Sequence, residues 1–153
     1  MPECHAAEAI SRTTESVVMR DGVRLATEIY RPLGLKVAAI VVRTPYGRVS
    51  QESKALLHAF SRAGYAAVFQ DCRGTGDSEP DHWDYYIYER EDSFDCVNWV
   101  IQRPWCNGFV AGCGGSYLAQ TQWCMALHPS MTEIAPEVGG LGVAYTTRVF
   151  TCS

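Results

Sequence analysis

The chain has 153 residues, 47% of them hydrophobic and 20% charged, and a formal net charge of −4. This length and composition are typical of one globular domain with an apolar core. The acidic balance, with Lys and Arg scattered along the chain, excludes the basic surface on which nucleic acids and anionic lipids bind. No apolar run reaches the roughly 18 residues of a membrane-spanning helix.

The N-terminal stretch lacks the basic segment and following apolar segment of a signal peptide, so we expect a cytoplasmic protein. Seven cysteines stand at positions 4, 72, 96, 106, 113, 124 and 152. None forms a CxxC pair and no His-x(3–5)-His accompanies them, so we expect neither a metal site nor another cofactor. We expect reduced, mostly buried thiols that pack as small apolar side chains.

Residues 1–14 are polar and weakly patterned, which predicts a flexible N-terminal arm. Two β-rich runs follow within residues 15–32, on either side of Asp21 and Gly22. Both of these residues tolerate a positive φ, so the stretch predicts an antiparallel hairpin.

After the hairpin, apolar strand-like runs alternate with amphipathic stretches. Near-continuous apolar runs are typical of parallel strands covered by helices on both faces, and a period near 3.6 residues predicts a helix. The predicted strands are 36–46, 65–71, 108–114 and 131–140, and the predicted helices are 50–65 (Leu56, Leu57, Phe60 and Ala63 on one face), 90–104 (carrying Phe94, Val97 and Ile101) and 117–128. This order predicts an α/β fold with a mainly parallel sheet.

Three informative stretches follow the predicted parallel strands, and function in such sheets lies at the carboxyl ends of the strands. They are RTPY at 43–46, DCRGTGDS at 71–78 and GGSY at 114–117. In the third, a serine on a sharp strand-to-helix turn would be exposed in front of free backbone N–H groups, as a catalytic nucleophile is. The strict G-x-S-x-G pattern fails because Leu118 stands at its last position, so an ordinary Gly-Ser helix start remains an alternative.

Five sequence blocks, at 17–32, 41–48, 64–80, 92–108 and 114–123, together resemble one family. Their order and spacing are similar to the N-terminal part of the X-Pro dipeptidyl-peptidase-like, or cocaine esterase-type, hydrolases. The resemblance covers about residues 15–136 and implies an α/β-hydrolase fold. Members of this family are longer, so it implies that residues 15–153 form a partial α/β-hydrolase domain. The helical cap, the last strands and the C-terminal jelly roll are expected to be absent, and the sheet to end after about its sixth strand.

The resemblance also implies a set of site residues. The family motif G-x-S-Y-x-G implies Ser116 as nucleophile and the backbone N–H of Tyr117 as one oxyanion donor. It implies the phenol of Tyr46 as the other donor, although Tyr46 as an aromatic residue closing a proline turn remains an alternative. The sequence departs from the motif at its last glycine, which is Ala119 here, and this methyl group is either tolerated or tilts the turn.

Two further stretches near the predicted site have open roles. Asp71 and Arg73 are expected to form a buried ion pair that fixes the loop beside the active site, and the glycines nearby do not fit a phosphate-binding loop. The aromatic stretch with Trp83, Tyr85, Tyr86 and Tyr88 either lines a pocket for an apolar acyl or aryl group or packs against a neighbouring domain. No substrate-binding residue is assigned from the sequence.

A general base for Ser116 is missing from the sequence pattern. His128 lies twelve residues along the same helix, about 18 Å away, and His58, His82 and His5 lie in other elements. We therefore hold two main hypotheses, and small-molecule binding at the same crevice at the strand ends remains a third. The chain is a serine hydrolase of a small-molecule ester or amide, completed by a partner chain, a homo-oligomer or further sequence. Alternatively, it is a non-catalytic remnant or interaction module that keeps the hydrolase sheet.

Overall fold

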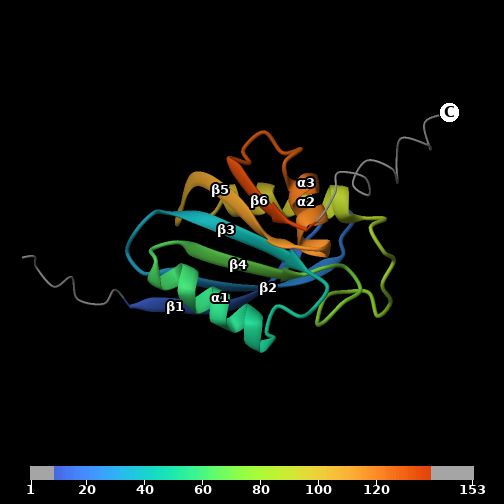
Figure 1. Ribbon diagram of the computed structural model, residues 1–153, viewed down its shortest axis with the longest axis horizontal. Coiled ribbons are helices and arrows are strands. Elements are labelled where there is room, and N and C mark those ends of the chain that lie inside the picture. The colour runs from blue at the N-terminus through green and yellow to red at the C-terminus, as the bar shows by residue number, and fades with distance from the viewer. Residues whose placement is uncertain (1–8, 139–153) are drawn as a thin grey trace, which may run out of the picture.

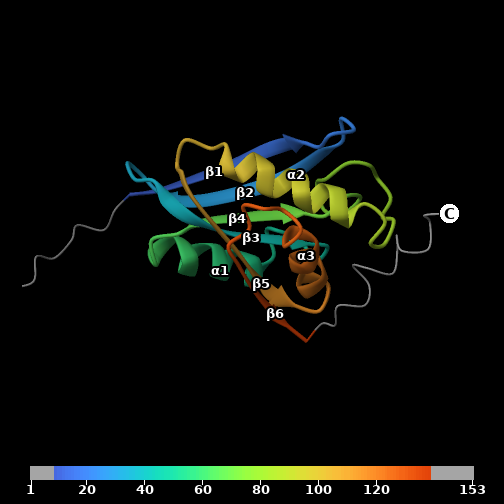
Figure 2. The same cartoon turned by 90° about the horizontal axis from the view of Figure 1, so that it is seen from above.

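The structure is a computed structural model in which residues 9–138 are described. Six strands form one mixed sheet in the order β1-β2-β4-β3-β5-β6. Helix α1 covers one face of this sheet, and α2 and α3 lie together on the other (Figures 1 and 2). The elements are β1 (Ile10–Val18), β2 (Arg24–Pro32), β3 (Val37–Thr44), α1 (Gln51–Arg62), β4 (Ala66–Asp71), α2 (Glu89–Ile101), β5 (Cys106–Gly115), α3 (Tyr117–Met125) and β6 (Glu133–Glu137).

The predicted α/β architecture is confirmed. The N-terminal hairpin is antiparallel, with Gly22 at φ +88° in its turn, and β2 also runs antiparallel to β4. The pairs β3–β4, β3–β5 and β5–β6 are parallel. The carboxyl ends of β3, β4 and β5 therefore meet at one edge of the sheet, where the three informative sequence stretches begin.

The boundary expected for the N-terminal arm was wrong. Strand β1 begins at Ile10, opposite Pro32 of β2, so residues 10–14 belong to the sheet. Their side chains are largely polar and show no strand pattern because β1 is an edge strand whose side chains are mostly exposed. Backbone hydrogen bonds to β2 stabilise such a strand without an apolar pattern. Residues 1–8 of the expected arm lie outside the described residues.

An apolar core lies on each face of the sheet. On the α2 side, Val41, Val68 and Val110 of the central strands pack with Val97 of α2. On the other side, Phe69 and Val42 pack with Leu57 of α1. The helix faces differ in part from those predicted. Leu56 is exposed beside the buried Leu57 in α1, and α2 buries Cys96, Val97 and Val100 while Phe94 and Ile101 are half-buried.

The described cysteines are free thiols, and Cys72, Cys96, Cys106 and Cys124 are buried, as expected from the sequence. Burial raises the pKa of Cys96 and Cys124 to about 12 and that of Cys113 to about 11. These thiols therefore stay protonated at neutral pH. Cys4 and Cys152 lie outside the described residues. Among residues 9–138, no helix has the length and apolar character needed to cross a membrane.

Candidate active site

Ser116 lies on a sharp turn between β5 and α3. Its backbone has φ +56° and ψ −122°, a conformation that non-glycine residues rarely adopt. The preceding Gly114 has φ +124°, and a Cβ atom there would lie 2.7 Å from the side chain of Leu118. A Cβ atom on Gly115 would lie 3.1 Å from the carbonyl oxygen of Glu137. Gly114 is therefore required by both its backbone conformation and its packing, and a side chain at Gly115 would need the Glu137 carbonyl to move by a few tenths of an ångström.

Backbone groups around Ser116 fix this turn. Its N–H donates to the carbonyl oxygens of Glu137 and Val138, at 3.1 and 3.2 Å, which holds the turn against β6. Tyr117 is the first residue of α3, so its N–H has no acceptor within the helix and lies at the positive end of the helix dipole. Ala119, the departure from the family motif, is fully buried and its N–H donates to the Ser116 carbonyl at 3.0 Å. Helix α3 thus forms normally with the alanine methyl group in place.

The structure brings Tyr46 and Ser116 together. Tyr46 follows β3, and its phenol oxygen lies 3.3 Å from the Ser116 hydroxyl oxygen, within hydrogen-bond distance. The two residues are 70 positions apart in the sequence, but β3 and β5 are parallel neighbours whose carboxyl ends meet. Tyr46 is 60% exposed, so its ring is accessible at the surface beside the serine.

The side chain of Tyr117 points away from this surface into the protein. Its phenol is buried, donates to Oε1 of Glu89 at 2.8 Å and accepts from the N–H of Tyr86 at 3.3 Å. Burial, followed by the neighbouring Glu89 carboxylate, raises the pKa of Tyr117 well above its usual value. The residue after Ser116 is thereby tied to the start of α2.

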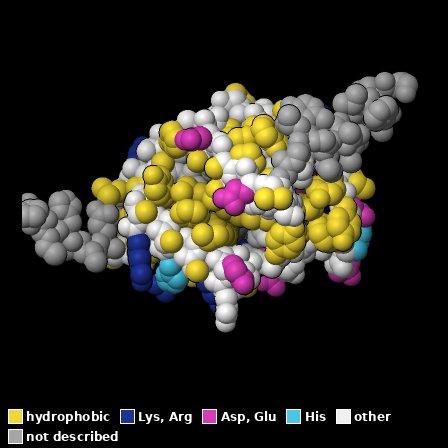
Figure 3. All heavy atoms as spheres, viewed as in Figure 1, with side chains coloured by type: hydrophobic (Ala, Val, Ile, Leu, Met, Phe, Trp, Pro, Cys, Tyr) yellow, Lys and Arg dark blue, Asp and Glu magenta, His cyan; other side chains and the backbone are white. Residues whose placement is uncertain are grey.

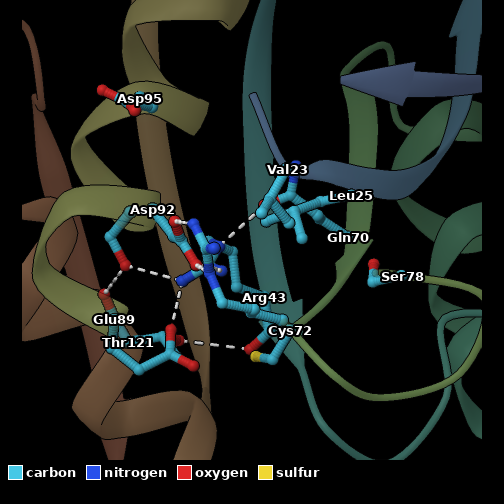
Figure 4. A network of polar contacts seen from close by, with 12 residues as sticks. Val23, Leu25, Arg43, Gln70, Cys72, Ser78, Glu89, Asp92, Asp95 and Thr121 are labelled. Carbon is cyan, nitrogen blue, oxygen red and sulfur yellow. Dashed lines mark hydrogen bonds and ion pairs between the residues drawn. The ribbon is translucent and has the colours of Figure 1, made fainter. Parts of the chain in front are cut away.

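A buried arginine, Arg43 of β3, holds the other side of Glu89 (Figure 4). Its guanidinium is ion-paired with Glu89 and donates to Gln70 at 2.8 Å and to Ser93 at 2.9 Å. Burial alone would lower the pKa of Arg43, but the nearby Glu89 and Asp92 carboxylates raise it. Hydrogen bonds and an ion pair thus run from the centre of the sheet through Glu89 to the Ser116 turn.

Sequence reasoning missed this connection. Its signal was Arg43, the one charged residue of β3 (Val37–Thr44). A charge in such a strand requires a buried partner. The pattern alone did not identify Glu89 as that partner, because it lies 46 residues further on.

The predicted ion pair between Asp71 and Arg73 was wrong. Asp71 accepts hydrogen bonds from the backbone N–H and the guanidinium of Arg48, at 2.7 and 2.5 Å. Arg73 instead contacts Asp92, at 2.7 Å, and Asp21, at 2.8 Å. Arg48 precedes α1 and Asp92 lies in α2, on opposite faces of the sheet, so the turn after β4 directs the two side chains apart.

The aromatic stretch 83–88 packs against Tyr117. The ring of Tyr86 stacks on that of Tyr117, with centroids 4.5 Å apart and an interplanar angle of 15°. Trp83 lies 5.5 Å from Tyr117 and stacks on Tyr85 at 3.9 Å. The stretch therefore lies next to the turn that carries Ser116.

None of the histidines within residues 9–138 hydrogen-bonds Ser116. His58 packs edge-on against Tyr30 with ring centroids 5.0 Å apart, and His82 lies on the surface 3.4 Å from Asp84. His128 is buried, which lowers its pKa, and its Nδ1 accepts from the N–H of Ser130 at 3.0 Å. His5 lies outside the described residues.

A model of the X-Pro dipeptidyl-peptidase (S15) family matches residues 21–149 of the chain. Cocaine esterase from Rhodococcus sp. (strain MB1 Bresler) is 40% identical over 130 residues, which cover 80% of this chain and 22% of that protein. The chain thus spans about a quarter of the length of the curated relatives it matches.

Solved structures show the same relationship. An α-amino acid ester hydrolase superposes with a TM-score of 0.71 at 28% identity, over 93% of this chain and 28% of that one. An aminopeptidase from the marine sediment archaeon Thaumarchaeota archaeon superposes with a TM-score of 0.69 at 28% identity, over 88% of this chain and 27% of that one. The six-stranded sheet therefore corresponds to part of the sheet of these enzymes.

Proposed function

Because the chain belongs to the X-Pro dipeptidyl-peptidase (S15) family, whose matched relatives include serine esterases, we propose that it carries the nucleophile and the oxyanion-binding groups of a serine hydrolase. Its substrate in this proposal is a small-molecule ester or amide. This is the same family that the five sequence blocks resemble.

The observation that carries the proposal is the conformation and surroundings of Ser116. A positive φ, a pair of glycines before it and a helix start after it are the features of a nucleophile turn. Strained residues of this kind persist where the surrounding structure holds them, and they cluster at active sites. The hydroxyl group also lies within hydrogen-bond distance of Tyr46.

In the proposed reaction, the Ser116 oxygen forms a bond to the carbonyl carbon of the substrate while its proton passes to a general base. The carbonyl oxygen becomes negatively charged, and the Tyr117 N–H and the Tyr46 phenol donate hydrogen bonds to it. The leaving alcohol or amine departs with a proton from the protonated base and leaves an acyl group on Ser116. Water then attacks this acyl-serine by the same route and releases the acid.

This proposal places the general base outside the present sequence, in a longer form of the protein or in a partner chain. The group that orients the base is placed there as well. The support for this assignment is that the histidines within residues 9–138 (His58, His82 and His128) contact other groups. The second candidate, a non-catalytic module, is favoured by the same observation. Without a base, oxyanion donors and binding alone retain only a small part of the rate.

The test is intact-mass spectrometry of the complete protein, with the polypeptide that supplies the base present, after treatment with an alkyl fluorophosphonate. An activated serine attacks phosphorus, fluoride leaves, and the mass rises by one phosphonyl group. We expect one adduct that Ser116→Ala abolishes and that Ser16→Ala, a change at an exposed serine of β1, preserves. An adduct that survives Ser116→Ala would exclude Ser116 as the nucleophile. The absence of any adduct on a demonstrably folded chain would favour the non-catalytic module.

A further inference from the structure

The buried carboxylate of Glu89 lies at the start of α2, in contact with the residue that follows Ser116. Its Oε1 accepts a hydrogen bond from the Tyr117 phenol at 2.8 Å, and its Oε2 is ion-paired with the guanidinium of Arg43 (Figure 4). Glu89 is 4% exposed and Arg43 is fully buried, so water competes little for either contact. The carboxylate thus connects the central strand β3 with the Ser116 turn.

Tyr117 is held from the interior of the protein. Figure 3 shows hydrophobic side chains gathered on the surface at the right of the view, where the loops after β3 and β4 lie in Figure 1. Tyr46, which follows β3, is 60% exposed, whereas Tyr117 is 3% exposed. The Tyr117 phenol also accepts from the N–H of Tyr86, and the two rings stack with centroids 4.5 Å apart. Of its two hydrogen bonds, the one to the Glu89 carboxylate is the stronger, because the acceptor is charged.

The turn that precedes Tyr117 is strained and is supported on both sides. Ser116 has φ +56° and ψ −122°, and such a conformation persists where the surrounding structure holds it. On the β5 side, the Ser116 N–H donates to two carbonyl oxygens at and just after the end of β6. On the α3 side, the Ser116 carbonyl oxygen accepts from Ala119, and the Tyr117 phenol is bonded to Glu89. The peptide between Ser116 and Tyr117, which carries the proposed oxyanion donor, lies where these two sides meet.

Stability alone gives little reason for a charge at this buried position. A buried ion pair is often no more stabilising than apolar side chains of similar volume. A hydrogen bond to a carboxylate is short and directional, so it fixes the position of its donor more closely than an apolar contact does. Burial, followed by the neighbouring Glu89 carboxylate, raises the pKa of Tyr117, so the phenol stays protonated and able to donate. The contact is therefore suited to holding Tyr117 in one position.

Given the proposed hydrolase function, on which this inference rests, we infer that Glu89 is a positioning residue for the oxyanion donor. Through the Tyr117 phenol it fixes the peptide between Ser116 and Tyr117, so that the Tyr117 N–H points at the developing oxyanion. Without this hydrogen bond the Tyr117 ring still stacks on Tyr86, but the strained peptide can rotate towards a relaxed conformation. The N–H then points partly away from the substrate, and the transition state loses part of one donor.

The kinetic test removes a single hydroxyl group. Tyr117→Phe abolishes the hydrogen bond to Glu89 and keeps the ring that stacks on Tyr86. The assay uses the complete protein, with the polypeptide that supplies the base present, and 4-nitrophenyl acetate as the ester. We expect kcat to fall about tenfold, which is less than the roughly 10²–10³-fold loss of a whole oxyanion donor. KM is expected to stay unchanged, since the oxyanion forms only on the way to the transition state.

Two further variants separate positioning from stability. Tyr30→Phe is the matched control, because it removes the same atom from another buried tyrosine, which lies in β2 and packs with Leu57 of α1; its kcat is expected to be unchanged. Arg43→Met/Glu89→Gln removes the buried ion pair but leaves an amide oxygen that accepts from the Tyr117 phenol. We expect this double variant to keep its kcat even where its midpoint in urea changes. Circular dichroism of each variant confirms that it is folded.

The orientation of the N–H group can be measured without turnover. Protein labelled with ¹⁵N at tyrosine and phenylalanine gives an NMR signal for residue 117 both before and after Tyr117→Phe, and the other labelled amides report the alignment of the molecule. We expect the N–H residual dipolar coupling of residue 117 to change in Tyr117→Phe. It is expected to stay the same in Tyr30→Phe and in Arg43→Met/Glu89→Gln.

Three results would overturn the inference: an unchanged kcat in Tyr117→Phe, an unchanged dipolar coupling of residue 117 in that variant, or an equal loss of kcat in Arg43→Met/Glu89→Gln. The fluorophosphonate adduct distinguishes these results from a failure of the proposed function. An adduct on Ser116 together with any of the three would refute the role of Glu89 alone. The absence of an adduct would refute the proposed nucleophile, and with it any role of Glu89 in the reaction.

Discussion

Replacing Arg43 with methionine is expected to lower the free energy of unfolding by about 3–5 kcal/mol, the usual loss when one partner of a buried ion pair is removed. Arg43 is fully buried, and its guanidinium contacts Glu89, Ser93 and Gln70. Methionine fills much of the volume but donates no hydrogen bond. The carboxylate of Glu89 then keeps the phenol of Tyr117 as a partner but loses its buried countercharge.

Two further variants separate the buried charge from other effects of the substitution. Arg20→Met removes a bidentate contact to Asp95 from a side chain that is 53% exposed, so we expect a loss of about 0–1 kcal/mol. The double variant Arg43→Met/Glu89→Gln replaces the buried pair with neutral groups, and the amide oxygen still accepts from Tyr117. We expect it to be more stable than Arg43→Met alone, because no uncompensated charge remains.

The assay is equilibrium unfolding in urea, followed by tryptophan fluorescence and circular dichroism at pH 7, with coincidence of the two probes as the check for two-state behaviour. A loss below about 1 kcal/mol for Arg43→Met would refute the reasoning, because that is the range of an exposed pair. A double variant no more stable than the single variant would show that packing, and not the charge, accounts for the loss.

Three other predictions concern the site edge and the thiols. Tyr46→Phe is expected to slow serine acylation in the complete enzyme by about 10²–10³-fold, the usual loss for one oxyanion donor. Stopped-flow acylation kinetics measures this change, and an unchanged rate would leave Tyr46 as a packing residue. Gly76→Ala is expected to destabilise the fold by more than Gly34→Ala. Both glycines have positive φ, but a Cβ atom at Gly76 would clash with the Asp71 carboxylate while Gly34 has open space; equal midpoints in urea would contradict this. Cys113, whose pKa burial raises to about 11, should resist iodoacetamide at pH 8 in the folded chain and react as pH approaches that value, as peptide mapping can show.

The sequence was informative where local patterns and tertiary structure agree. The Asp21–Gly22 turn, the apolar strands and the helix after Ser116 follow from residue type and period, because burial on both faces of a parallel sheet leaves an apolar run. The first residues of β1 have no such apolar run. An edge strand is stabilised by backbone hydrogen bonds, which carry no side-chain signal.

The resemblance identified Ser116 and Tyr46 as candidates, but a distance of 3.3 Å between their oxygens depends on the order of the strands. Sequence places them 70 residues apart, and only the parallel pairing of β3 with β5 brings their strand ends together. Ion-pair partners were least predictable. Asp71 and Arg73 are two residues apart, yet they pair across opposite faces of the sheet with Arg48 and Asp92.

The sequence by itself therefore determined the element types, the glycine pair at the Ser116 turn and the family. The tertiary structure decided which charges meet in the interior and which rings lie beside the serine. The physical reason is that backbone conformation and hydrophobic burial depend on residues a few positions apart, so both leave local patterns in the sequence. Contacts such as Arg43 with Glu89, or Tyr86 with Tyr117, join segments 46 and 31 residues apart, and they exist only once the sheet and its helices have packed.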